Sequence, residues 1–364
     1  MTAGPLKDKL ESCSEGPFKK SDFVIGHRGA PLQFPEHSKE SYMAAARQGA
    51  GTIECDVTFT KDKKLVCRHS QCDLHTTTNI LQIPALNAKC TTPFKAAVNG
   101  TGATAKCCTS DITLAEFQTL CAKMDGTPNP KATTVKEYLT TPVFRTDLFS
   151  TCGKVMTHLE SIKLIDSYGL DFTPELKAPE VPMPFSGYTQ EQYAQDVIND
   201  YKNLGIHPSR VWPQSFVPGD IFYWIKAEPN FGKQAVYLDE RVDVADNYTV
   251  AVASIPDLAK RGVKILAPAM FALTKVSSNG TIVPSEYAIA AKKAGIKLIA
   301  WSFERSGFLN NGGDYYYQYI SSVIKKDSDM YTVLDVLYKE VGIFKMFSDW
   351  PATVTYYANC MGIK

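Results

Sequence analysis

Short apolar runs alternate with longer amphipathic segments along the whole chain. The apolar runs are rich in β-branched residues and are typical of buried parallel strands. Eight such runs occur, at residues 23–27, 52–58, 170–176, 211–216, 235–238, 263–267, 297–303 and 342–347. Segments with helical spacing lie between them, at 38–48, 155–168, 190–203, 220–228, 285–294 and 331–340. Eight alternating strand and helix units predict an α/β fold, the (β/α)₈ TIM barrel.

The connection between the second and third runs is unusually long. Residues 59–169 separate these runs, whereas an ordinary connection of this kind needs far fewer residues. Helical spacing at 113–123 and 155–168 accounts for part of the surplus. The rest, at about 70–110, is rich in Thr, Asn, Gly and Cys and predicts an inserted subdomain over the barrel mouth. We therefore expect a single barrel domain over residues 1–364 with a cysteine-containing insertion after the second strand.

Composition and charge exclude several classes of protein. Of the 364 residues, 44% are hydrophobic and 21% are charged, which suffices for a large core. The 39 basic and 38 acidic residues nearly cancel, so nothing favours nucleic acid or an anionic membrane surface as a partner. No apolar run approaches the length of a membrane span, and we expect no integral membrane segment.

The cysteines and glycosylation sequences favour a secreted glycoprotein. The chain has ten cysteines and three Asn-x-Ser/Thr sequences, at Asn99, Asn247 and Asn279. Six cysteines crowd into a polar region where we expect little hydrophobic burial and therefore disulfides: Cys72, Cys90, Cys107, Cys108, Cys121 and Cys152. The first residues lack the apolar core of a signal peptide, so the expected leader is not part of this sequence. The alternative is a cytosolic protein with reduced thiols.

Carboxylates recur at a spacing of two on the predicted strands. Glu54 and Asp56 point to one face of the second strand, and Glu175 and Lys177 share a face of the third. Carboxylates inside a barrel are costly unless a cation neutralises them, and a hard divalent ion takes oxygen ligands. The lysine could hold a phosphate oxygen. The alternatives are an exposed edge strand with ordinary polar alternation and a simple Glu–Lys salt bridge.

Two histidines follow apolar runs, where a strand gives way to a loop. His27 and His69 would lie at the carboxyl ends of strands, the active-site face of such barrels, and imidazole suits acid and base catalysis near neutral pH. Arg28 lies between Gly26 and Gly29 and offers a planar fork for a phosphate. With the carboxylates and the lysine, these residues predict a phosphodiester-cleaving site.

The order of these motifs resembles a known family. Gly26-His-Arg-Gly-Ala30, Pro35-Glu-His-Ser38, Ile53-Glu-Cys-Asp-Val57, Thr60-Lys-Asp62 and the terminal His69 are similar to the opening signature of glycerophosphodiester phosphodiesterases. Looser matches follow at Pro174-Glu-Leu-Lys177, Gln214-Ser-Phe216, Trp301 and Phe347-Ser-Asp-Trp-Pro351. The resemblance implies His27 and His69 as the catalytic pair, Glu54, Asp56 and Glu175 as metal ligands, and Arg28 and Lys177 as phosphate contacts. His37 stands where the family usually has asparagine, and Ser348 where threonine is usual.

The resemblance implies a phosphodiesterase that hydrolyses a small-molecule glycerophosphodiester to glycerol 3-phosphate and an alcohol. The expected cofactor is one divalent cation, Mg²⁺ or Ca²⁺. Phe216 and Trp301 would line the substrate pocket, although barrel aromatics also serve as core. A phospholipase D or sphingomyelinase D-like lipid phosphodiesterase on the same barrel is the nearest alternative, followed by a non-catalytic binding protein.

Overall fold

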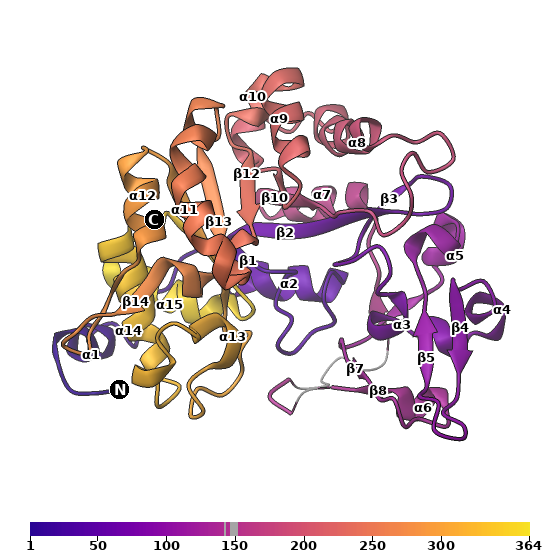
Figure 1. Ribbon diagram of the computed structural model, residues 1–364, viewed down its shortest axis with the longest axis horizontal. Coiled ribbons are helices and arrows are strands. Elements are labelled where there is room, and N and C mark those ends of the chain that lie inside the picture. Colours follow the sequence, from indigo (N-terminus) through magenta and orange to yellow (C-terminus); the bar gives the residue numbers. More distant parts are fainter. Residues whose placement is uncertain (142, 146–151) are drawn as a thin grey trace. The chain divides into compact units, whose positions relative to one another are not determined.

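The computed structural model describes residues 1–141, 143–145 and 152–364 (Figure 1). Within them, eight parallel strands form a closed barrel surrounded by helices, which confirms the predicted TIM barrel. All eight predicted runs are strands, with ends moved by a few residues: β1 (Ser21–Gly26), β2 (Ala50–Phe59), β10 (Asp171–Leu176), β11 (Gln214–Ser215), β12 (Val236–Asp239), β13 (Ile265–Pro268), β16 (Lys297–Phe303) and β17 (Lys345–Ser348). The sheet order is β1-β17-β16-β13-β12-β11-β10-β2, and β1 also pairs with β2.

Every segment with helical spacing between the barrel strands contains a helix. The longer helices of the described residues are α1 (Pro5–Glu11), α2 (Lys39–Arg47), α7 (His158–Ser167), α8 (Gln190–Asn203), α9 (Pro218–Ala227), α11 (Ala245–Lys260), α12 (Glu286–Lys293), α14 (Asp329–Val336) and α15 (Pro351–Met361). Thr157 and Thr189 begin α7 and α8 by accepting a backbone N–H of the first turn. The prediction missed α11, which has Pro256 in its interior, and α15, which starts at Pro351.

The chain divides into two compact units, and the first comprises residues 1–27, 45–52 and 211–364. Its parallel strands hold Val24 opposite Met346 and Gly26 opposite Ser348. Helices α11 and α12 lie side by side (Figure 1). Its shorter elements are α10 (Pro229–Gly232), α13 (Asp314–Tyr317) and the hairpin β14 (Thr274–Val276) with β15 (Ile282–Pro284). The barrel-side core of this unit is a cluster of Ile25, Val236, Leu238, Ile265, Ala267, Ile299 and Phe347.

The second unit comprises residues 28–44 and 53–210. Here β3 (Leu65–Cys67) pairs antiparallel with the end of β2, and the long connection to β10 follows. The connection consists of short elements: α3 (Leu74–Thr77), α4 (Pro84–Asn87), β4 (Thr92–Lys95), β5 (Thr104–Lys106), α5 (Leu114–Phe117), β6 (Cys121–Ala122), β7 (Thr127–Pro128), α6 (Val135–Tyr138), β8 (Leu139–Thr140) and β9 (Gly153–Lys154).

The helix predicted at 113–123 is wrong in extent. Thr113 caps a single turn, α5, which ends at Phe117. The chain then turns so that Cys121 pairs with Lys154 in a short antiparallel ladder and forms a disulfide with Cys152. These tertiary contacts override a helical preference that is only local.

The cysteine-rich connection has a core of its own, so the expectation of little hydrophobic burial there is wrong. The predicted disulfides are present as Cys72–Cys108 and Cys90–Cys107. The buried apolar side chains are scattered singly among polar residues in the sequence, so no periodic pattern predicts their burial. They are Val66, Leu74, Ile80, Leu81, Leu86, Ala103, Ile112, Phe117, Leu120, Ala122, Ala132, Tyr138 and Val155, with Cys90 and Cys107. Disulfides and packing therefore stabilise this region together.

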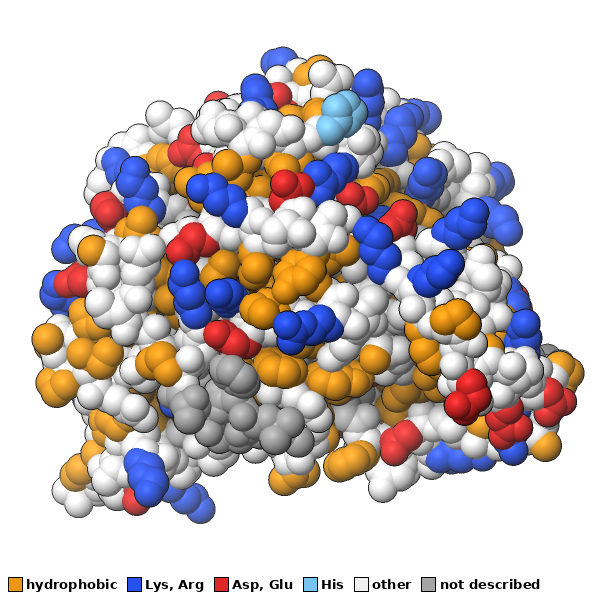
Figure 2. All heavy atoms as spheres, turned by 180° about the vertical axis from the view of Figure 1, so that it is seen from behind, with side chains coloured by type: hydrophobic (Ala, Val, Ile, Leu, Met, Phe, Trp, Pro, Cys, Tyr) orange, Lys and Arg blue, Asp and Glu red, His pale blue; other side chains and the backbone are white. Residues whose placement is uncertain are grey.

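All ten cysteines are paired in disulfides, the other two being Cys13–Cys360 and Cys55–Cys67. No described helix is long and apolar enough to cross a membrane. Basic and acidic side chains are interspersed on the face shown in Figure 2.

Candidate functional site

Three carboxylates converge in the second unit. Glu54 and Asp56 occupy alternate positions of β2 and therefore point to the same side, and Glu175 reaches them from β10. One ligand oxygen from each lies within 4.8 Å of the other two, and the three residues are at most 5% exposed. The structure thus brings together the three residues expected to bind a metal, in a group that could hold one divalent cation.

A nearby positive charge would stabilise this buried group of carboxylates. Burial, followed by the charges of Asp56 and Glu175, raises the pKa of Glu54 well above its usual value. Burial likewise raises the pKa of Glu175 to about 8. Asp56 Oδ1 is buried and accepts no hydrogen bond from the described residues. An acceptor oxygen in this state is costly, and a hard cation with oxygen ligands would satisfy it.

Lys177 and Arg28 are the basic residues of this group, as the sequence predicted. Lys177 Nζ is 2.6 Å from Glu175 Oε1. Burial alone would lower the pKa of Lys177, but the carboxylates of Glu175 and Asp56 outweigh burial and raise it. The backbone N–H of Arg28 donates to Glu54 Oε2 at 2.9 Å. The guanidinium of Arg28 donates to Glu36 Oε2 at 2.8 Å. Both cations are therefore held beside the carboxylates in a charged state.

His37 orients Asp56. Its Nε2 is 2.8 Å from Asp56 Oδ2, and its Nδ1 is 2.9 Å from the hydroxyl of Tyr42. Complete burial holds the pKa of His37 well below its usual value, so the imidazole is neutral. The protonated Nε2 then donates a hydrogen bond to Asp56, and Nδ1 accepts a hydrogen bond from the Tyr42 hydroxyl. His37 thus supplies a hydrogen bond to Asp56 at the position where the resembled signature usually has asparagine, and nothing in the sequence pointed to Tyr42.

The loop between β1 and α2 depends on Gly29. Its φ of +96° lies in the left-handed region, and a Cβ there would lie 2.3 Å from Ser41 Oγ and 2.7 Å from the Ser41 backbone carbon. Ser41 Oγ accepts the Ala30 N–H at 2.8 Å and donates to the Arg28 carbonyl at 3.1 Å. Only glycine lets the loop close on Ser41, and this closure places the Arg28 N–H against Glu54.

We expect Gly29→Ala to destabilise the protein by more than about 2 kcal/mol, because a left-handed φ and a backbone clash add together. Urea unfolding measures the loss. Gly187→Ala is the matched control, since Gly187 has a φ of +81° with nothing within 4 Å of the added Cβ. Equal losses for the two variants would contradict the role given to the Ser41 contact.

His69 follows β3 in the same unit, and two linkages fix its strand to β2. The Arg68 N–H donates to the Asp56 carbonyl at 2.8 Å, and the Cys55–Cys67 disulfide joins the two strands. Ligand atoms of His69, Glu36 and Asp73 lie within 4.8 Å of one another. Burial raises the pKa of Asp73 to about 7. Neither Glu36 nor Asp73 had an expected role, although Glu36 is part of the Pro-Glu-His-Ser motif.

His27 lies at the end of β1 in the first unit and is 8% exposed. Its N–H donates to the Ser348 carbonyl at 3.0 Å. Its Nδ1 is 2.5 Å from Asp349 Oδ1 and 2.7 Å from Ser302 Oγ. Asp349 belongs to the Phe347-Ser-Asp-Trp-Pro351 motif but had no expected role, and neither did Ser302, which directly follows Trp301.

Phe216 and Trp301, the aromatics expected to line a pocket, contact each other in the first unit. Their ring centroids are 5.8 Å apart and the rings are nearly perpendicular. Both are half-buried against the barrel-side core, and the indole N–H of Trp301 donates to the Ala267 carbonyl at 2.7 Å. Their role as pocket residues stays a prediction.

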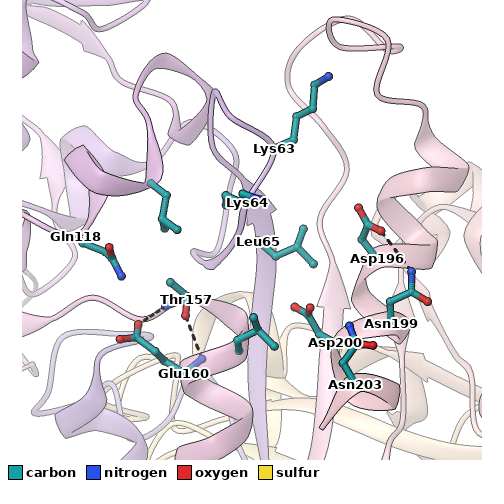
Figure 3. Close-up of a pocket in the computed structure, with 12 residues that line it drawn as sticks. Lys63, Lys64, Leu65, Gln118, Thr157, Glu160, Asp196, Asn199, Asp200 and Asn203 are labelled. Atoms are coloured by element: carbon teal, nitrogen blue, oxygen red, sulfur yellow. Dashed lines mark hydrogen bonds between the residues drawn. The ribbon is translucent and has the colours of Figure 1, made fainter.

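A pocket of about 520 Å³ in the second unit contains none of these residues. Figure 3 shows Leu65, Thr157 and Asp200 among the side chains around it. Its polar groups are largely engaged with the protein: Thr157 and Glu160 form a helix cap, and Asp200 Oδ2 lies 2.9 Å from His158 Nδ1. The residues around this pocket are therefore distinct from the carboxylate group and from the histidines that the sequence singled out.

Comparisons with known proteins identify the family of the chain. Residues 27–337 match the Glycerophosphoryl diester phosphodiesterase family. An Arthroderma benhamiae protein named "Extracellular protein" is 52% identical over 246 residues, which are 66% of this chain and 100% of that protein. "Probable glycerophosphodiester phosphodiesterase 1" of Mycobacterium tuberculosis is 47% identical over 49 residues, 14% of this chain and 18% of that protein.

Solved structures share the fold. A glycerophosphodiester phosphodiesterase from Parabacteroides distasonis superposes with a TM-score of 0.54 at 16% identity, covering 95% of this chain and 100% of that one. An Oleispira antarctica phosphodiesterase in complex with the product sn-glycerol-3-phosphate has a TM-score of 0.53 at 18% identity, covering 92% and 95%. From the family match over most of its length, the chain belongs to the glycerophosphoryl diester phosphodiesterase family and is an enzyme of that class.

Proposed function

We propose that the protein hydrolyses glycerophosphodiesters to glycerol 3-phosphate and an alcohol with the help of one bound divalent cation. The buried group of Glu54, Asp56 and Glu175 carries the proposal. Their ligand oxygens lie close to one another and one Asp56 oxygen accepts no hydrogen bond from the described residues, which suits a cation. Oxygen ligands of this kind suit Mg²⁺ or Ca²⁺. When bound, such an ion would polarise a phosphate oxygen and offset its negative charge.

The protein's own residues would perform the proton transfers. One of the two histidines, His27 or His69, takes a proton from the attacking hydroxyl, and the other gives a proton to the departing alcohol oxygen. The P–O bond to that alcohol breaks as the new P–O bond forms. Where the attacking hydroxyl belongs to the glycerol, water then opens the resulting cyclic phosphate, so by either route the net reaction adds one water. Arg28 and Lys177 would bind the phosphate oxygens, and Phe216 and Trp301 would contact the apolar part of the substrate.

An assay with glycerophosphocholine tests the proposal. Protein stripped with EDTA should release little glycerol 3-phosphate and choline, and Mg²⁺ or Ca²⁺ should restore the release. Vesicles of intact phosphatidylcholine and sphingomyelin, supplied in parallel, test the lipid-cleaving alternative. Cleavage of the vesicles without cleavage of glycerophosphocholine would contradict the proposed substrate class.

We also propose that the protein is secreted and glycosylated. Five disulfides support an oxidising compartment, and the Arthroderma benhamiae relative is named an extracellular protein. The side chains of Asn99, Asn247 and Asn279 are exposed. Mass spectrometry of the protein from its natural source, before and after removal of N-linked glycans, would test the modification. An unmodified asparagine at all three positions would contradict it.

A further inference from the structure

Two consecutive residues at the end of β17, Ser348 and Asp349, contact His27. The Ser348 carbonyl accepts its N–H, and the neighbouring Asp349 places Oδ1 2.5 Å from His27 Nδ1. Asp349 is completely buried. We propose that Asp349 is a positioning residue that orients the imidazole of His27 and keeps its proton on Nδ1. The inference rests on the proposed function, in which His27 transfers a proton.

The contact decides which ring nitrogen of His27 can react. A carboxylate accepts hydrogen bonds but donates none, so the 2.5 Å contact requires a proton on His27 Nδ1. In the neutral imidazole the lone pair then lies on Nε2, which becomes the nitrogen that takes and returns a proton. When Nε2 gains that proton, the adjacent carboxylate stabilises the imidazolium.

The groups around Asp349 favour its ionised form. Arg305 Nε is 3.2 Å from Asp349 Oδ2, and the Ser302 hydroxyl lies 3.4 Å from Oδ1. Glu304 is the other buried acid nearby, and its Oε2 accepts the Asp349 N–H at 2.9 Å. Burial, and then the charge of Asp349, raise the pKa of Glu304 to about 8. The raised pKa of Glu304 places a proton on that acid at neutral pH, and Asp349 Oδ2 faces the positive charge of Arg305.

Asp349→Asn tests the role without changing the volume of the side chain. An amide can present its NH₂ group to His27 Nδ1 and so favour the tautomer with the proton on Nε2. With glycerophosphocholine, we expect kcat to fall at least about 10²-fold while KM changes by less than about threefold. Glu304→Gln is the matched control: it replaces a second buried acid of the same group with an isostere of its protonated form, and kcat should stay within a few-fold of the wild type.

NMR of ¹⁵N-histidine-labelled protein supplies a readout that does not depend on the substrate. In the wild type, the His27 signal, assigned by its loss in His27→Ala, should show a protonated Nδ1 with a far-downfield proton. In Asp349→Asn, that proton resonance should disappear and protonation should move to Nε2. A role in folding alone would lower the melting temperature without changing the tautomer of the folded protein.

The outcomes separate the inference from the function on which it rests. Loss of kcat and of the downfield resonance in folded Asp349→Asn, with both retained in Glu304→Gln, supports the positioning role. Wild-type kcat in Asp349→Asn, or equal losses in the two variants, overturns it. A wild-type protein that shows the resonance but hydrolyses no glycerophosphodiester with either cation overturns the proposed function instead.

Discussion

Replacing either His27 or His69 by alanine is expected to lower the turnover of glycerophosphocholine by at least about 10²-fold to 10⁴-fold, the usual contribution of a general acid or base. His69 follows a strand that is fixed to the carboxylate strand by a hydrogen bond and a disulfide, and it is half-buried. His27 is fixed at its Nδ1 side by Asp349. The His27 ring is thus held in place and the strand before His69 is fixed, and the loss should appear in kcat rather than in KM.

Steady-state kinetics and thermal unfolding of the same samples check this expectation. If the two histidines act in one exchange, the double variant should lose far less than the product of the single losses, because residues that work as a unit do not add. His207→Ala serves as the control, since His207 is exposed and its side chain bonds only to the nearby Ser209 among the contacts described. A folded His69→Ala variant with wild-type turnover would refute the assignment.

The metal-free protein is expected to lose stability as the pH rises from about 5 to about 8, and Mg²⁺ or Ca²⁺ is expected to restore it. Burial raises the pKa of Glu175 from its unperturbed value of 4.5 to about 8 in the folded state. A raised carboxyl pKa means that the folded protein retains a proton that the unfolded chain has released. The contribution of Glu175 to the free energy of unfolding is therefore complete below about pH 4.5 and is lost as the pH rises through 8. The loss is at most about 5 kcal/mol.

Thermal unfolding at about pH 5 and pH 8, with EDTA or with the cation, measures the effect. Bound cation should replace the lost proton, so the rise in melting temperature should be large at the higher pH and small at the lower. Glu175→Gln should remove this cation effect. Glu304 has a similarly raised pKa outside the carboxylate group, so Glu304→Gln should flatten the pH dependence and leave the cation effect intact. A melting temperature that does not change with added cation at either pH would contradict a cation site at the carboxylate group.

The sequence by itself determined the fold class and the residues of the carboxylate group. Strands and helices alternate with periods that local spacing reveals, so all eight barrel strands were predicted within a few residues of their ends. The position of Glu54 and Asp56 on one face follows from strand alternation alone. The same alternation placed Glu175 and Lys177 on one face of the third strand, and the structure brings both to this group.

Only the tertiary structure decided which residues support these groups. His37 bonds to Asp56 across 19 positions of sequence, and Asp349 bonds to His27 across 322. The core of the cysteine-rich connection likewise assembles from apolar residues that show no period. Periodicity reports contacts within one helix or strand, whereas these contacts join side chains from separate elements. Their partners are fixed by how the chain folds back on itself, a property that local spacing does not contain.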